Sequence, residues 1–96
     1  MSKSIICNDK VCWVCGTIYN LHCHHTMYGV RNRKKADKDG LFVWLCQEHH
    51  EGIYGVHGMC GHELDIQLKR VSEQAWLDHY GKTVEEFIER YGKNYI

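Results

Sequence analysis

The 96-residue sequence contains no proline, no excess of either charge and no hydrophobic run long enough to cross a membrane. Twelve Lys and Arg residues balance twelve Asp and Glu residues, so no overall positive field indicates a nucleic-acid partner. Such a partner must be inferred from a local patch. The longest apolar run, residues 41–46, is far shorter than the roughly 20 residues of a membrane-spanning helix, which excludes a transmembrane protein.

The first residues also lack the apolar core of a secretory signal, because the short apolar stretch at Ile5 and Ile6 ends before Asp9. We therefore expect a cytoplasmic protein. No linker, repeat or low-complexity segment divides the chain, which favours a single domain over residues 1–96. A chain of this length buries only about 60 to 65 % of its unfolded surface, so a hydrophobic core alone would be marginally stable.

Cysteine and histidine, in contrast, are abundant. The chain has six Cys and eight His, and thirteen of these fourteen residues lie between Cys7 and His62. Without an export signal, and with Cys12 and Cys15 only three positions apart, metal ligation is favoured over three disulfides. A bound metal would also supply the stability that a core of this size lacks.

The sequence predicts an α+β fold with a core over residues 1–62 that a bound metal stabilises. β-Forming residues surround the first two cysteines over residues 11–16, and residues 21–25 alternate, so we expect a β-hairpin that turns near Asn20. The polar and basic residues 26–40 are predicted to form a loop, with room for one helical turn. An apolar strand over residues 41–45 then leads to Cys46 and to a short helix that ends near Gly52.

Residues 63–96 are predicted to form a helical extension. Apolar residues recur at helical spacing over residues 63–80, which predicts an amphipathic helix that stops at Gly81. Thr83 and Glu86 fit a capping box, so a second and shorter helix is expected to begin after Thr83 and to end before Gly92.

Two pairs of residues have the spacing of zinc knuckles. Cys12 and Cys15 form a CxxC pair, and Cys46 and His49 form a CxxH pair thirty residues later. Three thiolates and one imidazole make a standard closed tetrahedral zinc site, and a knuckle on a hairpin with a second at a helix start is typical of a treble-clef fold. The alternative is that one pair consists of free buried thiols.

The remaining histidines exceed the needs of one structural site. Neighbouring residues of a strand point to opposite faces, so His24 and His25 can have different roles, one toward a cation and the other toward a substrate phosphate. His50 can approach the same place from the helix. The other potential ligands in this part of the chain are His22, His57, Cys60 and His62.

The order of these residues resembles the zinc-containing HNH, or ββα-metal, endonucleases. The match covers about residues 11–57. Over most of the chain the sequence is similar to small phage and prophage members of that family, related to a recombination-enhancing, RecA-dependent nuclease. The residues that carry the resemblance are Cys12 and Cys15, the segment 21–25 with the pair His24-His25, the segment 32–35, the segment 45–50 with Cys46, His49 and His50, the segment 55–57, and the ending 92–95.

The resemblance implies a treble-clef or ββα-metal fold and a metal-dependent DNA endonuclease that hydrolyses phosphodiester bonds. It implies a phage- or prophage-encoded protein of the bacterial cytoplasm that acts in recombination on DNA, with a RecA filament as a further partner. His25 would be the general base, since a neutral imidazole can take a proton from water at neutral pH. The implied metal ligands are Cys12, Cys15, Cys46 and His49 for structural zinc, and His24 and His50, with His57 as a further ligand, for a catalytic divalent ion such as Mg, Mn or Zn.

One residue of the family pattern is missing. The middle Asn of the family lies a few residues before the second knuckle, where this chain has Asp39, Gly40 and Leu41, and Asn32 lies nearer the His pair. The residue that orients His25 is therefore open.

A local basic patch lies between the His pair and the second knuckle. Five basic residues against Asp37 and Asp39 give residues 31–39 a charge of +3, so this segment is the candidate for phosphate contacts, with a solvated loop as the alternative. Two other functions stay open: a non-enzymatic zinc-containing DNA-binding module, and a metal sensor or store built on His57, Cys60 and His62. The basic residues of the patch are Arg31, Arg33, Lys34, Lys35 and Lys38.

Overall fold

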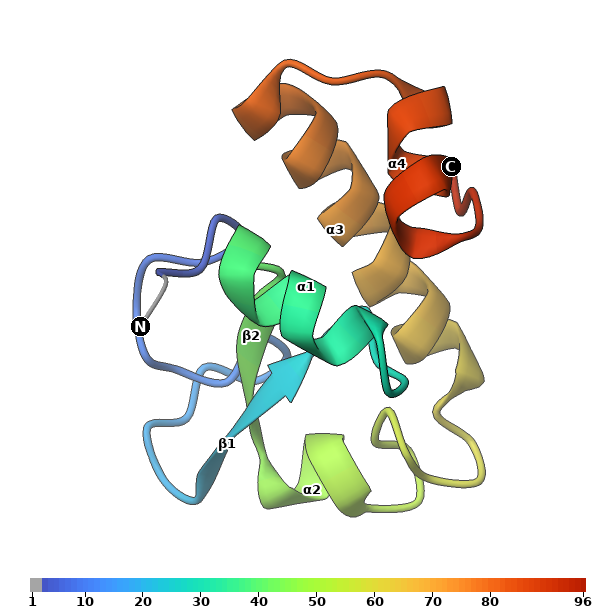
Figure 1. Cartoon of the computed structure of the whole chain (residues 1–96). Coiled ribbons are helices and arrows are strands. Elements are labelled where there is room, and N and C mark those ends of the chain that lie inside the picture. The colour runs from blue at the N-terminus through green and yellow to red at the C-terminus, as the bar shows by residue number, and fades with distance from the viewer. Residues whose placement is uncertain (1–2) are drawn as a thin grey trace.

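In the computed structural model, which describes residues 3–96, two strands and four helices form a small α+β fold (Figure 1). The sheet lies with α1 and α2 in one half of the molecule, and the long helix α3 runs from that half to the other, where α4 packs beside it (Figure 1). The expected α+β class is confirmed at this level. The elements in chain order are β1 (Leu21–His25), α1 (Asn32–Asp39), β2 (Phe42–Cys46), α2 (Gln47–Glu51), α3 (His62–Tyr80) and α4 (Val84–Tyr91).

The two strands pair antiparallel, with Leu21 opposite Cys46 and His25 opposite Phe42. β2 and the short helix α2 were expected from the sequence. The prediction of a hairpin over residues 11–25 is wrong, because residues 11–16 form turns instead of a strand. Within this segment the amide of Gly16 donates to the carbonyl of Cys12 at 2.8 Å, so the first knuckle is a tight turn. β1 pairs with β2 instead.

Helix α1 replaces the loop that the sequence predicts over residues 26–40. The helix buries only Ala36 and Asp39, and it has neither an acidic residue in its first turn nor a side-chain cap. It therefore lacks the apolar stripe and capping residues by which a helix is recognised in a sequence. It ends at Gly40, whose φ of 80° is one that glycine adopts without strain.

The two C-terminal helices are confirmed, including the capping box of Thr83 and Glu86. α3 contributes Leu68 to one hydrophobic cluster and Trp76 to another, so it joins the two halves of the fold. Within residues 3–96, every helix is too short or too polar to cross a lipid bilayer. The first cluster is Cys12, Val43, Leu45, Cys46, Val56 and Leu68; the second is Met27, Ala36, Leu41, Trp76, Phe87 and Tyr91.

Asp39, at the end of α1, is a buried carboxylate that binds three side chains of α3 and α4. Its oxygens accept hydrogen bonds from Trp76 Nε1 at 2.9 Å and from the Tyr91 hydroxyl at 2.7 Å. The guanidinium of Arg90 donates to both oxygens, at 2.5 and 2.9 Å. Burial, and then the hydrogen bond to Asp39, raises the pKa of Tyr91 above its ordinary value, which keeps the phenol as a donor.

Replacing Asp39 with alanine is expected to lower the free energy of unfolding by about 3 to 5 kcal/mol, because Arg90 loses its counter-charge and two donors lose their acceptor. Urea unfolding followed by circular dichroism measures the change. Asp78→Ala is the matched control, since Asp78 is exposed and accepts a hydrogen bond from the exposed Gln74, and it should change stability by less than about 0.5 kcal/mol. Equal unfolding of Asp39→Ala and the parent would show that α1 is not held through this carboxylate.

Candidate metal centres

The two predicted zinc knuckles meet in the structure. Cys12 and Cys15 lie on the turn before β1, Cys46 closes β2, and His49 follows one turn later on α2. One donor atom from each of these four residues lies within 4.8 Å of the others. The strand pairing that sets Leu21 opposite Cys46 brings the second knuckle back to the first.

The spacing of these donors fits a tetrahedral ion. With Zn–S bonds of about 2.3 Å and Zn–N bonds of about 2.0 Å, tetrahedral angles separate two sulfurs by about 3.8 Å and a sulfur from a nitrogen by about 3.5 Å. The Sγ atoms of Cys15 and Cys46 are 3.9 Å apart. His49 Nδ1 lies 3.7 Å from Cys12 Sγ and 3.2 Å from Cys46 Sγ. This cluster can hold a structural metal ion, and its donors suit zinc.

The backbone around Cys12 favours its thiolate, which is the form that binds a metal. Burial alone would raise the pKa of the Cys12 thiol, but hydrogen bonds from the backbone of Cys15, Cys46 and Val14 bring it down to about 6. The thiol of Cys12 therefore loses its proton readily at neutral pH, before any ion is present.

A second cluster consists of three imidazoles: His24 on β1, His50 on α2 and His57 on the loop that follows. One donor atom from each lies within 4.8 Å of the others. The ring centroids of His50 and His57 are 4.8 Å apart, and those of His24 and His57 are 5.2 Å apart. The three ligands that the family resemblance implies for a catalytic ion are thus brought together, with His57 as a full member.

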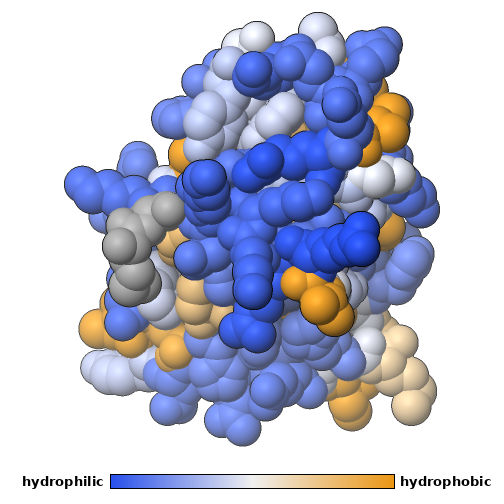
Figure 2. Space-filling view, in the orientation of Figure 1, coloured by the Kyte–Doolittle hydropathy of each residue, from blue (hydrophilic) through white to orange (hydrophobic). Residues whose placement is uncertain are grey.

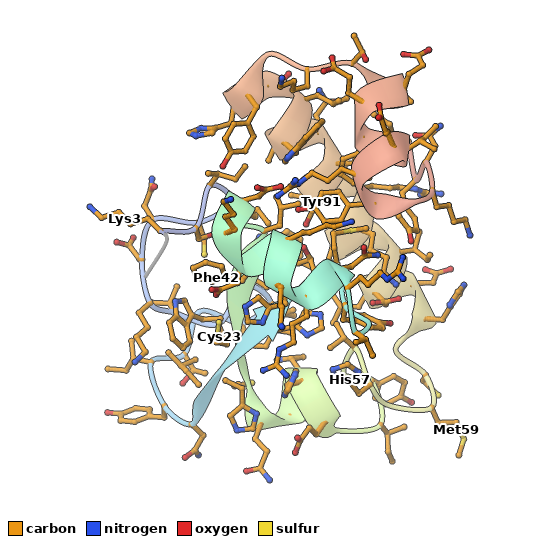
Figure 3. All side chains as sticks on the ribbon, in the orientation of Figure 1. Lys3, Cys23, Phe42, His57, Met59 and Tyr91 are labelled. Carbon is orange, nitrogen blue, oxygen red and sulfur yellow. The ribbon has the colours of Figure 1, made fainter. Side chains whose placement is uncertain are left out.

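The loop over residues 52–61 places His57 in this cluster. Glycine recurs at every third position, and the amide of Gly58 donates to the carbonyl of Gly55 at 2.8 Å. A Cβ atom at Gly58 would collide with the carbonyl oxygen of Gly52, so the loop folds tightly on itself. The amide of His57 donates to the carbonyl of His50 at 3.1 Å, which fixes the loop against α2. In Figure 3 the His57 side chain lies between α2 and the start of α1, whereas Met59 projects outward.

The His24 imidazole is in the state that binds a metal. The residue is 2 % exposed, and its Nε2 atom has no hydrogen-bond partner within the described part of the chain. Burial, and then the neighbouring His50 and His57, lowers the pKa of His24 to about 3, so the ring is neutral at neutral pH. A buried ring nitrogen without a hydrogen-bond partner, in a residue packed against two further imidazoles, is an arrangement that a cation would complete.

Within the described part of the chain, His25 lies outside this cluster, and it pairs with a residue that the sequence did not indicate. Its Nε2 atom lies 3.0 Å from Oδ1 of Asp37, on α1. An ionised carboxylate only accepts hydrogen bonds, so this contact requires the proton on Nε2 and leaves Nδ1 of the neutral ring as a free acceptor. Asp37 therefore orients the imidazole and selects its tautomer. Asn32, which follows the His pair in the sequence, instead donates to the carbonyl of Tyr91 at 3.2 Å.

The imidazoles line an open hollow of about 600 Å³. Arg33 and Lys34, at the start of α1, contribute to its wall, and Figure 2 shows that the surface over α1 is mainly hydrophilic. Arg31 and Lys38 are also exposed, whereas Lys35 donates to the carbonyl of Arg90 at 2.7 Å and braces α1 against α4. The residues around the hollow are Cys23, His24, His25, Tyr28, Gly29, Val30, Arg33, Lys34, His50 and His57.

The other expected ligands lie apart from both clusters. Among residues 3–96, Cys60 and His62 belong to no group of metal-binding side chains, and both are exposed. His22, in contrast, lies 2.9 Å from His50, nitrogen to nitrogen. Sequence reasoning missed the roles of Asp37 and His22 because both depend on tertiary contacts. The glycine at every third position over residues 52–61 was the visible signal for the loop that carries His57.

Comparisons of the chain with protein-family models, with curated proteins and with solved structures found no match. The function is therefore inferred from the geometry of the two clusters.

Proposed function

We propose that the protein is a metal-dependent HNH-type DNA endonuclease. One observation carries the proposal: three imidazoles converge on an open hollow next to a fourth, His25, which a carboxylate orients. The cysteine cluster offers four donors, as a closed structural zinc site does. The histidine cluster offers three and leaves room for a water or a substrate oxygen, as a catalytic site does.

The path of the chain supports the finer fold class. The first knuckle precedes β1, and the second spans the junction of β2 and α2, so two antiparallel strands and a helix carry both clusters. From this chain path we infer a treble-clef or ββα-metal core, with its first knuckle on a turn before β1. α1 is inserted between its two strands, and α3 and α4 follow it.

Three imidazole ligands favour a particular class of ion. Imidazole nitrogen suits Zn²⁺, Ni²⁺ and related transition metals, whereas Mg²⁺ takes oxygen ligands. A divalent ion at His24, His50 and His57 would neutralise the charge that develops on a phosphate during hydrolysis. We therefore expect cleavage with Mn²⁺, Ni²⁺ or Zn²⁺ to be faster than cleavage with Mg²⁺.

The residues of the chain divide the reaction between them. Nδ1 of His25 takes a proton from water, and the resulting hydroxide oxygen forms a bond to phosphorus. The bond from phosphorus to the leaving sugar oxygen breaks, and that oxygen takes a proton from solvent. Asp37 is a positioning residue, because it holds the proton on Nε2 and so keeps Nδ1 available.

The positions of Arg33 and Lys34 are evidence for a nucleic-acid substrate. They line the same hollow as the imidazoles, where contacts to phosphates would align a strand with His25. These contacts carry no information on base sequence, so we expect cleavage that tolerates many sequences and weakens as salt rises.

Plasmid cleavage tests the proposal. Zinc-loaded protein is mixed with supercoiled plasmid and with Mg²⁺, Mn²⁺, Ni²⁺ or Zn²⁺ in turn. The series is repeated with a RecA-coated single strand, because the family resemblance implies a RecA-dependent nuclease. We expect nicked product from the parent, and at least about 100-fold less from His24→Ala, since loss of a ligand should exceed the 10- to 100-fold effect of losing a partner of a ligand.

His62→Ala is the matched control, because His62 is exposed and lies outside the cluster. It should cleave as the parent does. If folded and zinc-loaded parent binds DNA but cleaves none with any ion, with or without RecA, the nuclease proposal is wrong and a zinc-containing DNA-binding module takes its place.

A further inference from the structure

His22 is a half-buried histidine that contacts the metal cluster and has no role in the proposed reaction. It lies on β1 two residues before His24, so both side chains project from the same face of the strand toward α2. The imidazole of His50 lies next to both, with ring centroids 5.1 Å from His22 and 5.3 Å from His24. His50 therefore contacts His22 as well as the two other imidazoles of the metal cluster.

The contact between His22 and His50 has the length of a hydrogen bond. Their Nδ1 atoms are 2.9 Å apart, which requires one nitrogen to carry a proton and the other to accept it. Two imidazoles on a common tetrahedral ion would be about 3.3 Å apart, with metal–nitrogen bonds of about 2.0 Å. His22, His50 and Glu51 form a further group of metal-binding side chains, but the Glu51 oxygen is 3.9 Å from His50 Nδ1, beyond hydrogen-bond distance.

We infer that His22 is a positioning residue that accepts the Nδ1 proton of His50 and so reserves Nε2 of His50 for the catalytic ion. Only this direction of the bond leaves His50 a metal donor, because the reverse direction places the proton of His50 on Nε2. A metal-binding histidine commonly donates its second ring nitrogen to a fixed acceptor, which sets the ring orientation and raises the affinity for the ion. The inference rests on the proposed histidine metal site.

Metal binding, measured without DNA, tests this role. Zinc-loaded protein is titrated with Co²⁺ by calorimetry and visible absorption, where a thiolate charge-transfer band would reveal exchange into the cysteine cluster. We expect His22→Ala to bind Co²⁺ about 10- to 100-fold more weakly than the parent and to shift the Co²⁺ spectrum. His22→Asn, which offers a carbonyl oxygen near the place of Nδ1, should restore both the affinity and the spectrum. Zinc content and thermal unfolding of each variant confirm that it is folded.

The outcomes separate this inference from the proposed function. If the parent takes up no ion beyond the cysteine cluster, the histidine metal site and the proposed nuclease fail together. If the parent binds Co²⁺ and His22→Ala binds it equally well, only the role of His22 is wrong. Glu51→Ala tests the alternative that His22, His50 and Glu51 hold a cation themselves. Loss of a bound ion in that variant would overturn the hydrogen-bond role of His22, and unchanged binding supports it.

Discussion

Replacing His25 with alanine is expected to lower the rate of DNA cleavage by about 10² to 10⁴, which is the usual contribution of a general base. The structure gives this residue two features of a base. Its Nε2 atom is engaged by Asp37 at 3.0 Å, and its imidazole lines the hollow where the three metal-binding imidazoles meet. Single-turnover cleavage of a radiolabelled duplex measures the chemical step apart from product release.

The fold and both metal clusters should survive this change, because His25 belongs to neither cluster. Zinc content, Co²⁺ uptake and thermal unfolding of His25→Ala are therefore expected to match those of the parent. His79→Ala is a suitable control, since His79 is exposed at the end of α3 and far along the chain from the hollow. A His25→Ala variant that cleaves at the parental rate would remove this imidazole from the reaction.

Asp37 provides a graded test of the same mechanism. Asp37→Ala frees the imidazole to rotate and to exchange tautomers, so we expect a lower kcat with little change in KM. Asp37→Asn keeps an oxygen that accepts from Nε2, and it should recover most of the loss. Equal losses in both variants would indicate that the charge of Asp37 matters and that the hydrogen bond alone does not position the base.

Elements that depend on neighbouring residues were predictable from the sequence, whereas those that depend on contacts between distant residues were not. β2, α3 and α4 follow from an apolar run, an apolar stripe and a capping box, all of which are patterns of neighbouring residues. α1 has no such pattern. Its stability depends on Asp39, whose partners Trp76 and Tyr91 lie 37 and 52 positions away. No pattern among the neighbouring residues indicates these contacts.

The candidate site divides in the same way. The spacing of Cys12, Cys15, Cys46 and His49 is itself the signature of a zinc site, and the structure brings the four residues together as expected. The partner of His25 was not predictable, because a polar segment interpreted as a loop gives no position for Asp37. Once the segment is a helix, Asp37 reaches the end of β1.

The second large effect is expected from the zinc cluster: Cys46→Ser should leave the protein without a cooperative fold. Cys12 and Cys46 are both buried members of the hydrophobic cluster formed with Val43, Leu45 and Leu68, so the ion and the core hold the same segments. A structural zinc ion contributes an apparent free energy of about 10 to 16 kcal/mol, whereas a whole domain is stable by only about 5 to 15 kcal/mol. Removing the ion with a chelator should therefore unfold the parent as well.

Two cysteines outside the cluster provide the controls. Cys23 and Cys60 are exposed, so Cys23→Ser and Cys60→Ser should keep one zinc ion and the parental melting temperature. Zinc content by mass spectrometry under native conditions and melting followed by circular dichroism separate the three variants. Since loss of zinc would unfold β2 and α2, it would also scatter His50 and His57, and cleavage would disappear with the fold. A Cys46→Ser variant that melts as the parent does would mean that the core alone holds the two knuckles together.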